Sequence, residues 1–300
     1  ISNGDYLRVM NEQMERFFDI EPYHTYRDYF NVSTAIAVSP ESGIGTVNTV
    51  RNTKFETTFT GGVGLRGNYS AIFNYAMEVS PVDESNLNQS LIVITPNTID
   101  YSGITEMWTD GSAIAFCPLS EDSYPYDARG IIQHEAGEHG FGKLGDEYIY
   151  HNAFIDFCTC LCCEHTETIN NAKALGWYEN LSLTGKMHEV PWSHLIFDDR
   201  YSDVVDIYEG GFKHARGVFR SEQNSCMNNN ISYYNAISRE AIVKRIMEYA
   251  GESYSFEKFV ENDKRDVVNS LSRSAERSGV TVRGNQYAPR IHKGKPDILK

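Results

Sequence analysis

The most informative part of the chain is Gln133-His134-Glu135-Ala136-Gly137-Glu138-His139-Gly140-Phe141-Gly142-Lys143-Leu144-Gly145-Asp146-Glu147-Tyr148. The motif His-Glu-x-x-His places two histidines on one face of a helix, where they can hold zinc. Here three residues separate Glu135 from His139, and five steps of an ideal helix set the imidazoles about 140° apart. A π-bulge absorbs one extra residue and is frequent at functional sites. We therefore predict a local widening of this helix between Glu135 and His139.

The residues after the second histidine supply candidates for a third zinc ligand. Glycines at positions 140, 142 and 145 end the helix, because glycine readily takes positive φ angles. The chain then brings Asp146 and Glu147 within reach of the histidines. Catalytic zinc takes three protein ligands and keeps a fourth position for water. We expect His134, His139 and Asp146 to bind zinc, with Glu147 as the reserve. The plain alternative is a chance pair of histidines on a surface or core helix.

Length and composition are those of an ordinary globular protein. The 300 residues suffice for one large domain or two small ones with a substantial core. The net charge of −14 argues against nucleic acid and against an anionic membrane surface as partners. No apolar run approaches the roughly 18 residues of a transmembrane helix. The chain begins at Ile1 without a signal segment, so we expect that any targeting segment has been removed or was never part of this sequence.

Six cysteines are present, and four of them are clustered. Their one-residue spacings do not match the Cys-x-x-Cys of a zinc knuckle, which favours a disulfide or plain thiols over a second metal site. The cluster comprises Cys158, Cys160, Cys162 and Cys163, and the two other cysteines are Cys117 and Cys226.

Apolar spacing predicts the main helices and strands. Helices are expected at residues 4–18, 68–78 and 238–249, with a polar, interrupted helix at 255–278. Strands are expected at residues 30–38, 90–95 (a buried central strand) and 113–117.

This order of elements predicts an α/β (α+β) fold, with a mixed, twisted sheet backed by helices. We expect residues 1–149 to form an upper subdomain that carries the histidine helix. Residues 150–270 would form a more irregular lower subdomain, and residues 271–300 a tail.

A second group of residues lies downstream, at Asn224-Ser225-Cys226-Met227. A plain loop with a buried methionine is the usual interpretation of such a stretch. Beside a zinc helix, however, a Ser-x-Met turn is what metzincin peptidases place beneath the metal as an apolar floor. The two segments therefore point to the same kind of site.

Several pieces of the chain, spread over roughly residues 4–265, together resemble the bacterial immunoglobulin-A metallopeptidase family. They are His134-Glu135-Ala136-Gly137, His139 to Tyr148, Ile207-Tyr208-Glu209-Gly210, Asn224-Ser225-Cys226-Met227, Ser238-Arg239-Glu240-Ala241-Ile242, Ile20-Glu21-Pro22-Tyr23 and Tyr29-Phe30-Asn31-Val32.

The resemblance implies a metzincin-like zinc endopeptidase that is secreted, periplasmic or on the bacterial cell surface and cleaves a protein or peptide substrate. By analogy, zinc would be held by the three expected ligands and would carry a water. Glu135 would take the proton of that water and pass it to the leaving amine. Met227 would form the Met-turn in the lower subdomain.

Glu138 is a departure from the family, because many relatives read His-Glu-x-Gly-His. An extra helical residue also occurs in dipeptidyl-peptidase-type zinc enzymes. The Glu138 carboxylate would either orient a histidine or lie on the solvent side of the bulge.

Other residues are candidates for contacts with substrate. Tyr148 and Tyr233 could donate to the oxyanion, although packed aromatic side chains are the commoner interpretation. The strand containing Ala113, Ile114 and Ala115 is expected at the sheet edge, where it could pair with an extended substrate.

Two other functions remain open at this point. One is a catalytically weak or inactive peptidase-fold protein that binds a host or dietary glycoprotein. The shifted histidine supports this interpretation, and the presence of a general base, Glu135, opposes it. The other is a cytosolic exopeptidase. The site motif does not carry substrate specificity, which depends on loops.

Overall fold

The computed structural model describes residues 5–62, 64–78, 81–155, 164–265 and 288–298. The chain divides into two compact units, each with helices and a β-sheet. The mixed α+β class predicted from the sequence is therefore confirmed. Unit 1 comprises Ile1–Asp19, Arg27–Phe141 and Asn285–Lys300, and unit 2 comprises Ile20–Tyr26 and Gly142–Gly284. The predicted subdomain boundaries stay a prediction.

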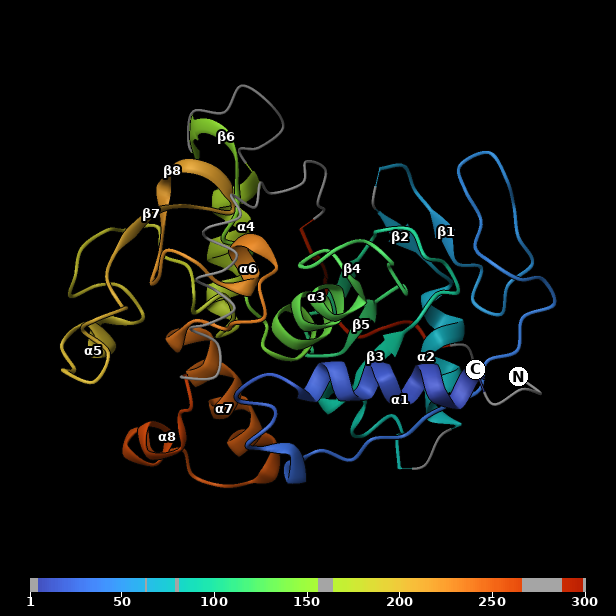
Figure 1. The fold of residues 1–300 in the computed structure, drawn as a ribbon, viewed down its shortest axis with the longest axis horizontal. Coiled ribbons are helices and arrows are strands. Elements are labelled where there is room, and N and C mark those ends of the chain that lie inside the picture. Colours follow the sequence, from blue (N-terminus) through green and yellow to red (C-terminus); the bar gives the residue numbers. More distant parts are fainter. Residues whose placement is uncertain (1–4, 63, 79–80, 156–163, 266–287, 299–300) are drawn as a thin grey trace. The chain divides into compact units, whose positions relative to one another are not determined.

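A four-stranded mixed sheet forms the centre of unit 1, in the order β3-β5-β4-β9 (Figure 1). The pairs β3–β5 and β4–β9 are parallel, and β4–β5 is antiparallel. A two-stranded ribbon, β1 (Thr58–Phe59) with β2 (Leu65–Arg66), completes the strands described in this unit. The strands of the sheet are β3 (Leu91–Ile94), β4 (Ile104–Trp108), β5 (Ala113–Phe116) and β9 (Arg290–His292).

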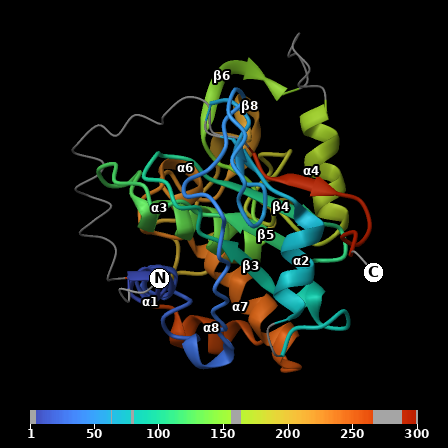
Figure 2. The ribbon, with the colours of Figure 1, turned by 90° about the vertical axis from the view of Figure 1, so that its right-hand side faces the viewer.

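The two faces of this sheet carry different side chains because successive residues of a strand point to opposite faces. On one face, large apolar side chains such as Trp108 and Phe116 pack with helix α2 (Tyr69–Met77) in a buried core. On the other face, η3 (Gln133–Phe141), the continuation of helix α3 (Ala128–Ile132), lies against the strands (Figure 2). The small side chains of Ala113 and Ala115 allow η3 to approach β5 closely.

The predicted N-terminal helices are confirmed. Helix α1 (Asp5–Phe18) buries Phe17 and Phe18. Helix α2 begins after Asn68, whose side chain accepts a hydrogen bond from the amide of Ala71, as an N-cap does. Two short 3₁₀ helices, η1 (Arg27–Tyr29) and η2 (Leu87–Gln89), complete the helical elements described in unit 1.

The predicted strand at residues 30–38 is wrong, because this segment forms no ladder with a neighbour. Its apolar side chains are largely exposed, including Val32 and Val38. The hydroxyls of Tyr6 and Tyr75 donate to the carbonyl oxygens of Ala35 and Ile36. Side chains, rather than a neighbouring strand, thus satisfy part of this backbone.

The predicted edge position of Ala113, Ile114 and Ala115 is also wrong. These residues belong to β5, which lies between β3 and β4 and is fully buried. Its backbone groups already pair on both sides, so it has no free edge to offer a substrate. The strands at the two edges are β3 and β9, and β3 is the strand that the sequence predicted as central. Its residues are partly exposed.

Strand β9 was not foreseen, because its residues fall in the predicted tail. It pairs with β4, which lies far from it in the sequence, and Glu106 is the partner of Arg290. Arg290 and His292 hold the buried carboxylate of Glu106 at 2.8 Å and 2.7 Å. The hydroxyl of Tyr69 donates to the same carboxylate at 2.7 Å.

Unit 2 contains a three-stranded sheet in the order β6-β8-β7. Strand β6 (Ile149–Phe154) runs parallel to β8 (Lys213–Arg220), and β7 (Tyr208–Gly211) runs antiparallel to it. Its longest described helix is α7 (Ala236–Ala250), which confirms the helix predicted at residues 238–249. The other helices are α4 (Glu164–Ala174), α5 (Ser193–Ile196), α6 (Cys226–Asn229) and α8 (Phe256–Asn262). Among the described residues of the chain, no helix has the length and apolarity needed to cross a membrane.

Candidate functional site

The histidine motif forms a π-helix. Helix α3 starts after Asp127, whose side chain accepts a hydrogen bond from the amide of Gly130 at 3.0 Å. The chain then continues as η3, and residues Gln133–Phe141 have π-helical geometry. The predicted widening between Glu135 and His139 is confirmed, and it extends over the whole motif. A wider turn is what the extra residue in the motif requires.

The π-helix brings the two histidines together. The ring centroids of His134 and His139 lie 4.7 Å apart, with the rings nearly perpendicular. Both side chains are buried, and their ligand atoms lie within 4.8 Å of one another. Two nitrogens bound to one tetrahedral zinc would be about 3.4 Å apart. The two imidazoles therefore lie close enough together to be candidates for a shared metal ion.

A residue of strand β4, Thr105, contacts Glu135 through its hydroxyl. The hydroxyl of Thr105 lies 2.8 Å from Oε2 of Glu135 and 2.7 Å from its backbone oxygen, so its single proton is shared between them. A Cβ on Gly103 would lie only 2.9 Å from Cγ and Oε1 of Glu135. The Glu135 carboxylate thus lies where a side chain at position 103 would otherwise be.

Thr105 and Gly103 are functional candidates that the sequence analysis missed. The run Ile104-Thr105-Glu106-Met107-Trp108 has the β-branched and aromatic residues of a strand. That signal could have placed β4, but it could not have placed Thr105 under Glu135.

Glu138 is fully buried, so the interpretation that it lies on the solvent side of the bulge is wrong. Its carboxylate comes within 4.8 Å of a ring nitrogen of His134. A carboxylate at this place fits the other expectation, that Glu138 orients a histidine.

A buried thiol belongs to the same layer of unit 1. Cys117 is free, and burial, with the nearby charge of Glu135, raises its pKa well above the ordinary value. It therefore stays a neutral thiol. Cys226 in unit 2 is likewise buried. The four clustered cysteines, Cys158 to Cys163, lie outside the described residues.

The remaining predicted site residues belong to unit 2, where Glu147 has a structural role. Its Oε2 accepts from the hydroxyl of Ser225 at 2.6 Å. Its Oε1 accepts from the side-chain amides of Asn180 at 2.9 Å and Asn235 at 2.8 Å. Its backbone amide donates to the carbonyl of Met227 at 2.9 Å. Burial raises the pKa of Glu147. Glu147 thus links the segment that follows the π-helix to the turn that contains Ser225 and Met227.

Met227 is fully buried at the start of α6, and Ser225 is the N-cap of that helix. Asp146 is buried as well, beside Glu147 in the chain. Of the two tyrosines, Tyr148 is buried, with its ring 4.7 Å from that of Tyr150. Tyr233 donates its hydroxyl proton to Glu222 at 2.7 Å, so the geometry does not direct it towards an oxyanion.

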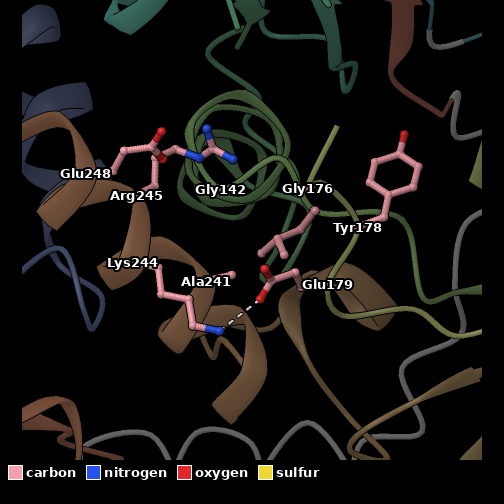
Figure 3. A pocket seen from close by; sticks show the side chains of 9 residues that line it. Gly142, Gly176, Tyr178, Glu179, Ala241, Lys244, Arg245 and Glu248 are labelled. Atoms are coloured by element: carbon pink, nitrogen blue, oxygen red, sulfur yellow. Dashed lines mark hydrogen bonds and ion pairs between the residues drawn. The ribbon is translucent and has the colours of Figure 1, made fainter. Parts of the chain in front are cut away.

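Within the part of the chain that the structure describes, buried His, Glu, Asp and Cys side chains form groups that could hold a metal ion, and His134 belongs to them. A separate small pocket in unit 2 holds none of the predicted site residues (Figure 3). It is crossed by the ion pair of Lys244 with Glu179 at 3.2 Å. The groups that could hold a metal ion thus include residues of η3 and none of the residues that line this pocket.

Comparison of the chain with models of known protein families gives no match. Comparison with curated protein sequences gives no significant match.

Proposed function

We propose that this protein is a zinc-dependent peptidase whose metal is held by the π-helix. The observation that carries the proposal is the pairing of His134 with His139, at 4.7 Å between ring centroids, across a helix widened to accommodate the extra residue. A π-helix is rare and tends to occur at functional sites. Two buried imidazoles with a glutamate beside the first are the donor set that zinc hydrolases use.

Asp146 is the proposed third ligand. It follows His139 by seven residues, so the chain keeps it within about 25 Å even when fully extended. Its neighbour Glu147 is the less suitable ligand, because three side-chain donors already bind its carboxylate. When bound, zinc would supply a Lewis acid that polarises a peptide carbonyl and acidifies water.

Glu135 is the proposed general base. The carboxylate would accept a proton from the attacking water and deliver it to the leaving amine. Thr105 and Gly103 act as positioning residues, because one donates to the carboxylate and the other leaves it room. A binding protein would have no need of this arrangement.

The finer parts of the proposal rest on the family resemblance. They are a metzincin-like fold, Met227 as the floor of the metal site, extracellular protein substrates and a secreted, periplasmic or cell-surface location. The burial of Met227 and its hydrogen-bonded tie to Glu147 are compatible with the Met-turn role.

The test combines elemental analysis with digestion of an unbiased peptide library. Wild-type protein is compared with His139→Ala, Asp146→Ala, Glu135→Gln and, as a matched control, the exposed Glu84→Gln. We expect both ligand variants to lose a zinc ion and cleavage. Glu135→Gln should keep zinc and lose cleavage by at least about 100-fold. Chelation should abolish cleavage, and added zinc should restore it.

Zinc that is retained in His139→Ala would contradict the metal assignment. If the protein binds zinc as expected but cleaves no peptide, the better interpretation is a binding protein on a peptidase scaffold. Cleavage at the wild-type rate by Glu135→Gln would contradict the role of Glu135 as general base.

A further inference from the structure

Strand β9 covers one edge of the sheet in unit 1. It stands at the end of the order β3-β5-β4-β9, so β4 is its one neighbour among the described strands. The pairing is parallel and joins Glu106–Trp108 to Arg290–His292 (Figure 2). A strand this short, paired on one side, makes few backbone hydrogen bonds. Most of its attachment to the sheet therefore comes from side chains.

The side chains that attach β9 lie on one face of the sheet. Arg290 and His292 share a face, because they are two residues apart on a strand. Both contact the carboxylate of Glu106, and the ring of His292 stacks on Trp108 at 4.7 Å. The hydroxyl of Tyr69, on helix α2, donates to the same carboxylate, so this is the face that α2 covers. Arg290 and His292 are partly exposed, so solvent can compete for these contacts.

Strand β4, which β9 covers, also contacts the proposed general base. The hydroxyl of Thr105 lies 2.8 Å from Oε2 of Glu135, and Gly103 directly precedes the strand and leaves room for that carboxylate. The other end of η3 lies against β3, where Gly140 approaches Leu91. Glu135 therefore lies on the side of the sheet towards β4 and its neighbour β9.

The register places the chain before β9 beside the same part of β4. Because Arg290 pairs with Glu106, the preceding residue, Pro289, lies alongside Thr105. Pro289 is buried, and it has no amide hydrogen to donate to the ladder. An extended peptide that paired with β4 at this edge would run past the residue that contacts Glu135, as in recognition by addition of a strand. The chain's own segment now occupies that place.

Glu106 gives this edge a preference for positive charge. Its side chain is fully buried, and Tyr69, Arg290 and His292 all contact its carboxylate. Two of these partners leave if β9 leaves. A buried carboxylate without a cationic partner is costly, so a peptide that takes the place of β9 is favoured when it brings a Lys or Arg opposite Glu106. Arginine suits this position best, because its planar fork can bind a carboxylate through two nitrogens.

We propose that β9 is an internal competitor for a peptide-binding edge on β4, and that an extended substrate with a basic residue opposite Glu106 displaces it. This proposal rests on the peptidase function proposed above and adds a regulatory strand and a substrate preference to it. The apparent affinity for substrate is reduced by the small fraction of molecules whose edge is open. Removal of β9 should therefore make the site more available.

The first test measures peptide binding by fluorescence anisotropy. The probe is a labelled synthetic peptide of residues 288–295, and all proteins carry Glu135→Gln so that the peptide is not consumed. We expect the chain truncated after residue 287 to bind it at least about 10-fold more tightly than the full chain does. The chain truncated after residue 293 keeps β9 and is the matched control. A peptide with Arg290→Ala and His292→Ala should bind at least about 10-fold more weakly.

A second variant keeps the result clear if the shorter chain folds poorly. Arg290→Ala/His292→Ala in the full chain loosens β9 without removing it. Its control is Lys293→Ala/Lys295→Ala, which replaces two exposed basic residues that follow the strand. With Glu135 intact, the first variant should cleave extended peptides with kcat/KM raised at least about 10-fold, and the control should match wild type.

The preference for basic residues is measured in the peptide-library digest. In Glu106→Gln the ratio of cleavage at basic to neutral sequences should fall towards one, because the buried charge is absent. This ratio does not depend on how much of the protein is folded. An unchanged ratio would overturn the substrate preference.

The two proposals fail separately. Equal peptide affinity in the two truncated chains and the full chain, with equal cleavage by Arg290→Ala/His292→Ala and wild type, would overturn the role of β9 and leave the peptidase function intact. Tighter peptide binding after removal of β9, without cleavage by any variant, would leave β9 as a displaceable strand and overturn the peptidase function.

Discussion

At the scale of single residues, Glu135, the proposed general base, is distinguished by the groups that surround its carboxylate. A carboxylate that must accept a proton in one geometry needs a fixed partner and free space. Thr105 of β4 supplies the partner, and Gly103, which directly precedes this strand, leaves the space. The contribution of each residue to the cleavage rate can be measured separately from metal binding.

Replacing Thr105 with Val removes the hydroxyl and keeps the shape, whereas Thr105→Ser keeps the hydroxyl. We expect kcat to fall about 10-fold or more in Thr105→Val, with KM and zinc content unchanged, because the Glu135 carboxylate loses its orienting donor. Thr105→Ser should stay close to wild type. Steady-state kinetics on one defined peptide measures this. Equal kcat in Thr105→Val and wild type would show that the contact is not needed.

Gly103→Ala tests the space around the same carboxylate. The new Cβ would come within 2.9 Å of Glu135 Cγ and Oε1, so the side chain must move away from its position. We expect kcat/KM to fall about 10-fold to 100-fold while zinc stays bound, because the histidines are not displaced. Unchanged kinetics, or loss of zinc along with activity, would contradict this account.

Glu222 gives unit 2 a pH-dependent stability. It accepts hydrogen bonds from Tyr233 and from the amide of Ala236, both at 2.7 Å, and burial raises its pKa from 4.5 to about 7. Between these pH values the unfolded chain binds fewer protons than the folded chain. The free energy of unfolding should therefore fall as pH rises from 4.5 to 7, by up to about 3 kcal/mol.

Urea unfolding across this pH range, with chelator present throughout, measures the effect. Glu222→Gln should show a flatter dependence, because the amide does not titrate. Glu261→Gln, which replaces an exposed carboxylate, should keep the wild-type slope. Identical slopes in both variants would rule out Glu222 as the source.

At the scale of elements, the π-helix depends on close contact with the sheet. A Cβ on Gly140 would lie 2.6 Å from Cδ1 of Leu91 on β3 and 3.2 Å from the carbonyl oxygen of Glu135. The absence of a side chain at this position lets the widened helix lie against the edge strand. The same face of the sheet carries alanines on β5, so η3 rests on small residues.

Gly140→Ala should therefore destabilise unit 1 by about 1–3 kcal/mol through overpacking. Leu91→Ala removes the atoms that would clash, so the double variant should be more stable than the sum of the two single effects predicts. Denaturant unfolding in a double-mutant cycle should give a coupling of about 0.5–3 kcal/mol. Additive effects would mean that the helix does not depend on this contact.

At the scale of the whole molecule, residues close to the C-terminus complete a sheet that begins near residue 91. Strand β9 adds Arg290 and His292 to the fully buried Glu106 of β4. Leaving a buried carboxylate without its ion-pair and hydrogen-bond partners is strongly destabilising. Strand β9 is therefore part of the sheet of unit 1 and supplies partners to its buried carboxylate.

Truncation after residue 287 should lower the stability of unit 1 by about 3 kcal/mol, a value near the low end for a buried pair because Arg290 and His292 are partly exposed. Truncation after residue 293 keeps β9 and serves as the control. Thermal and denaturant unfolding would measure the difference. If both truncations have the stability of the full chain, β9 does not contribute to the fold.

The sequence by itself determined the local features. The five-residue spacing of His134 and His139 required a π-helix, and apolar spacing located α1, α2 and α7. Each of these signals depends on residues within a few turns of one another, where backbone geometry and capping act directly. The ligand set and the general base remain predictions that came from the same local motif.

Only the tertiary structure decided which segments became neighbours. It made β5 an inner strand, added β9 beside β4 and placed Thr105 under Glu135. It also brought the ring nitrogens of His165 and His214 within 2.9 Å of each other. These contacts join residues that lie tens to nearly two hundred positions apart in the sequence. Their pairing depends on the order of the strands and on long-range packing, which no short pattern encodes.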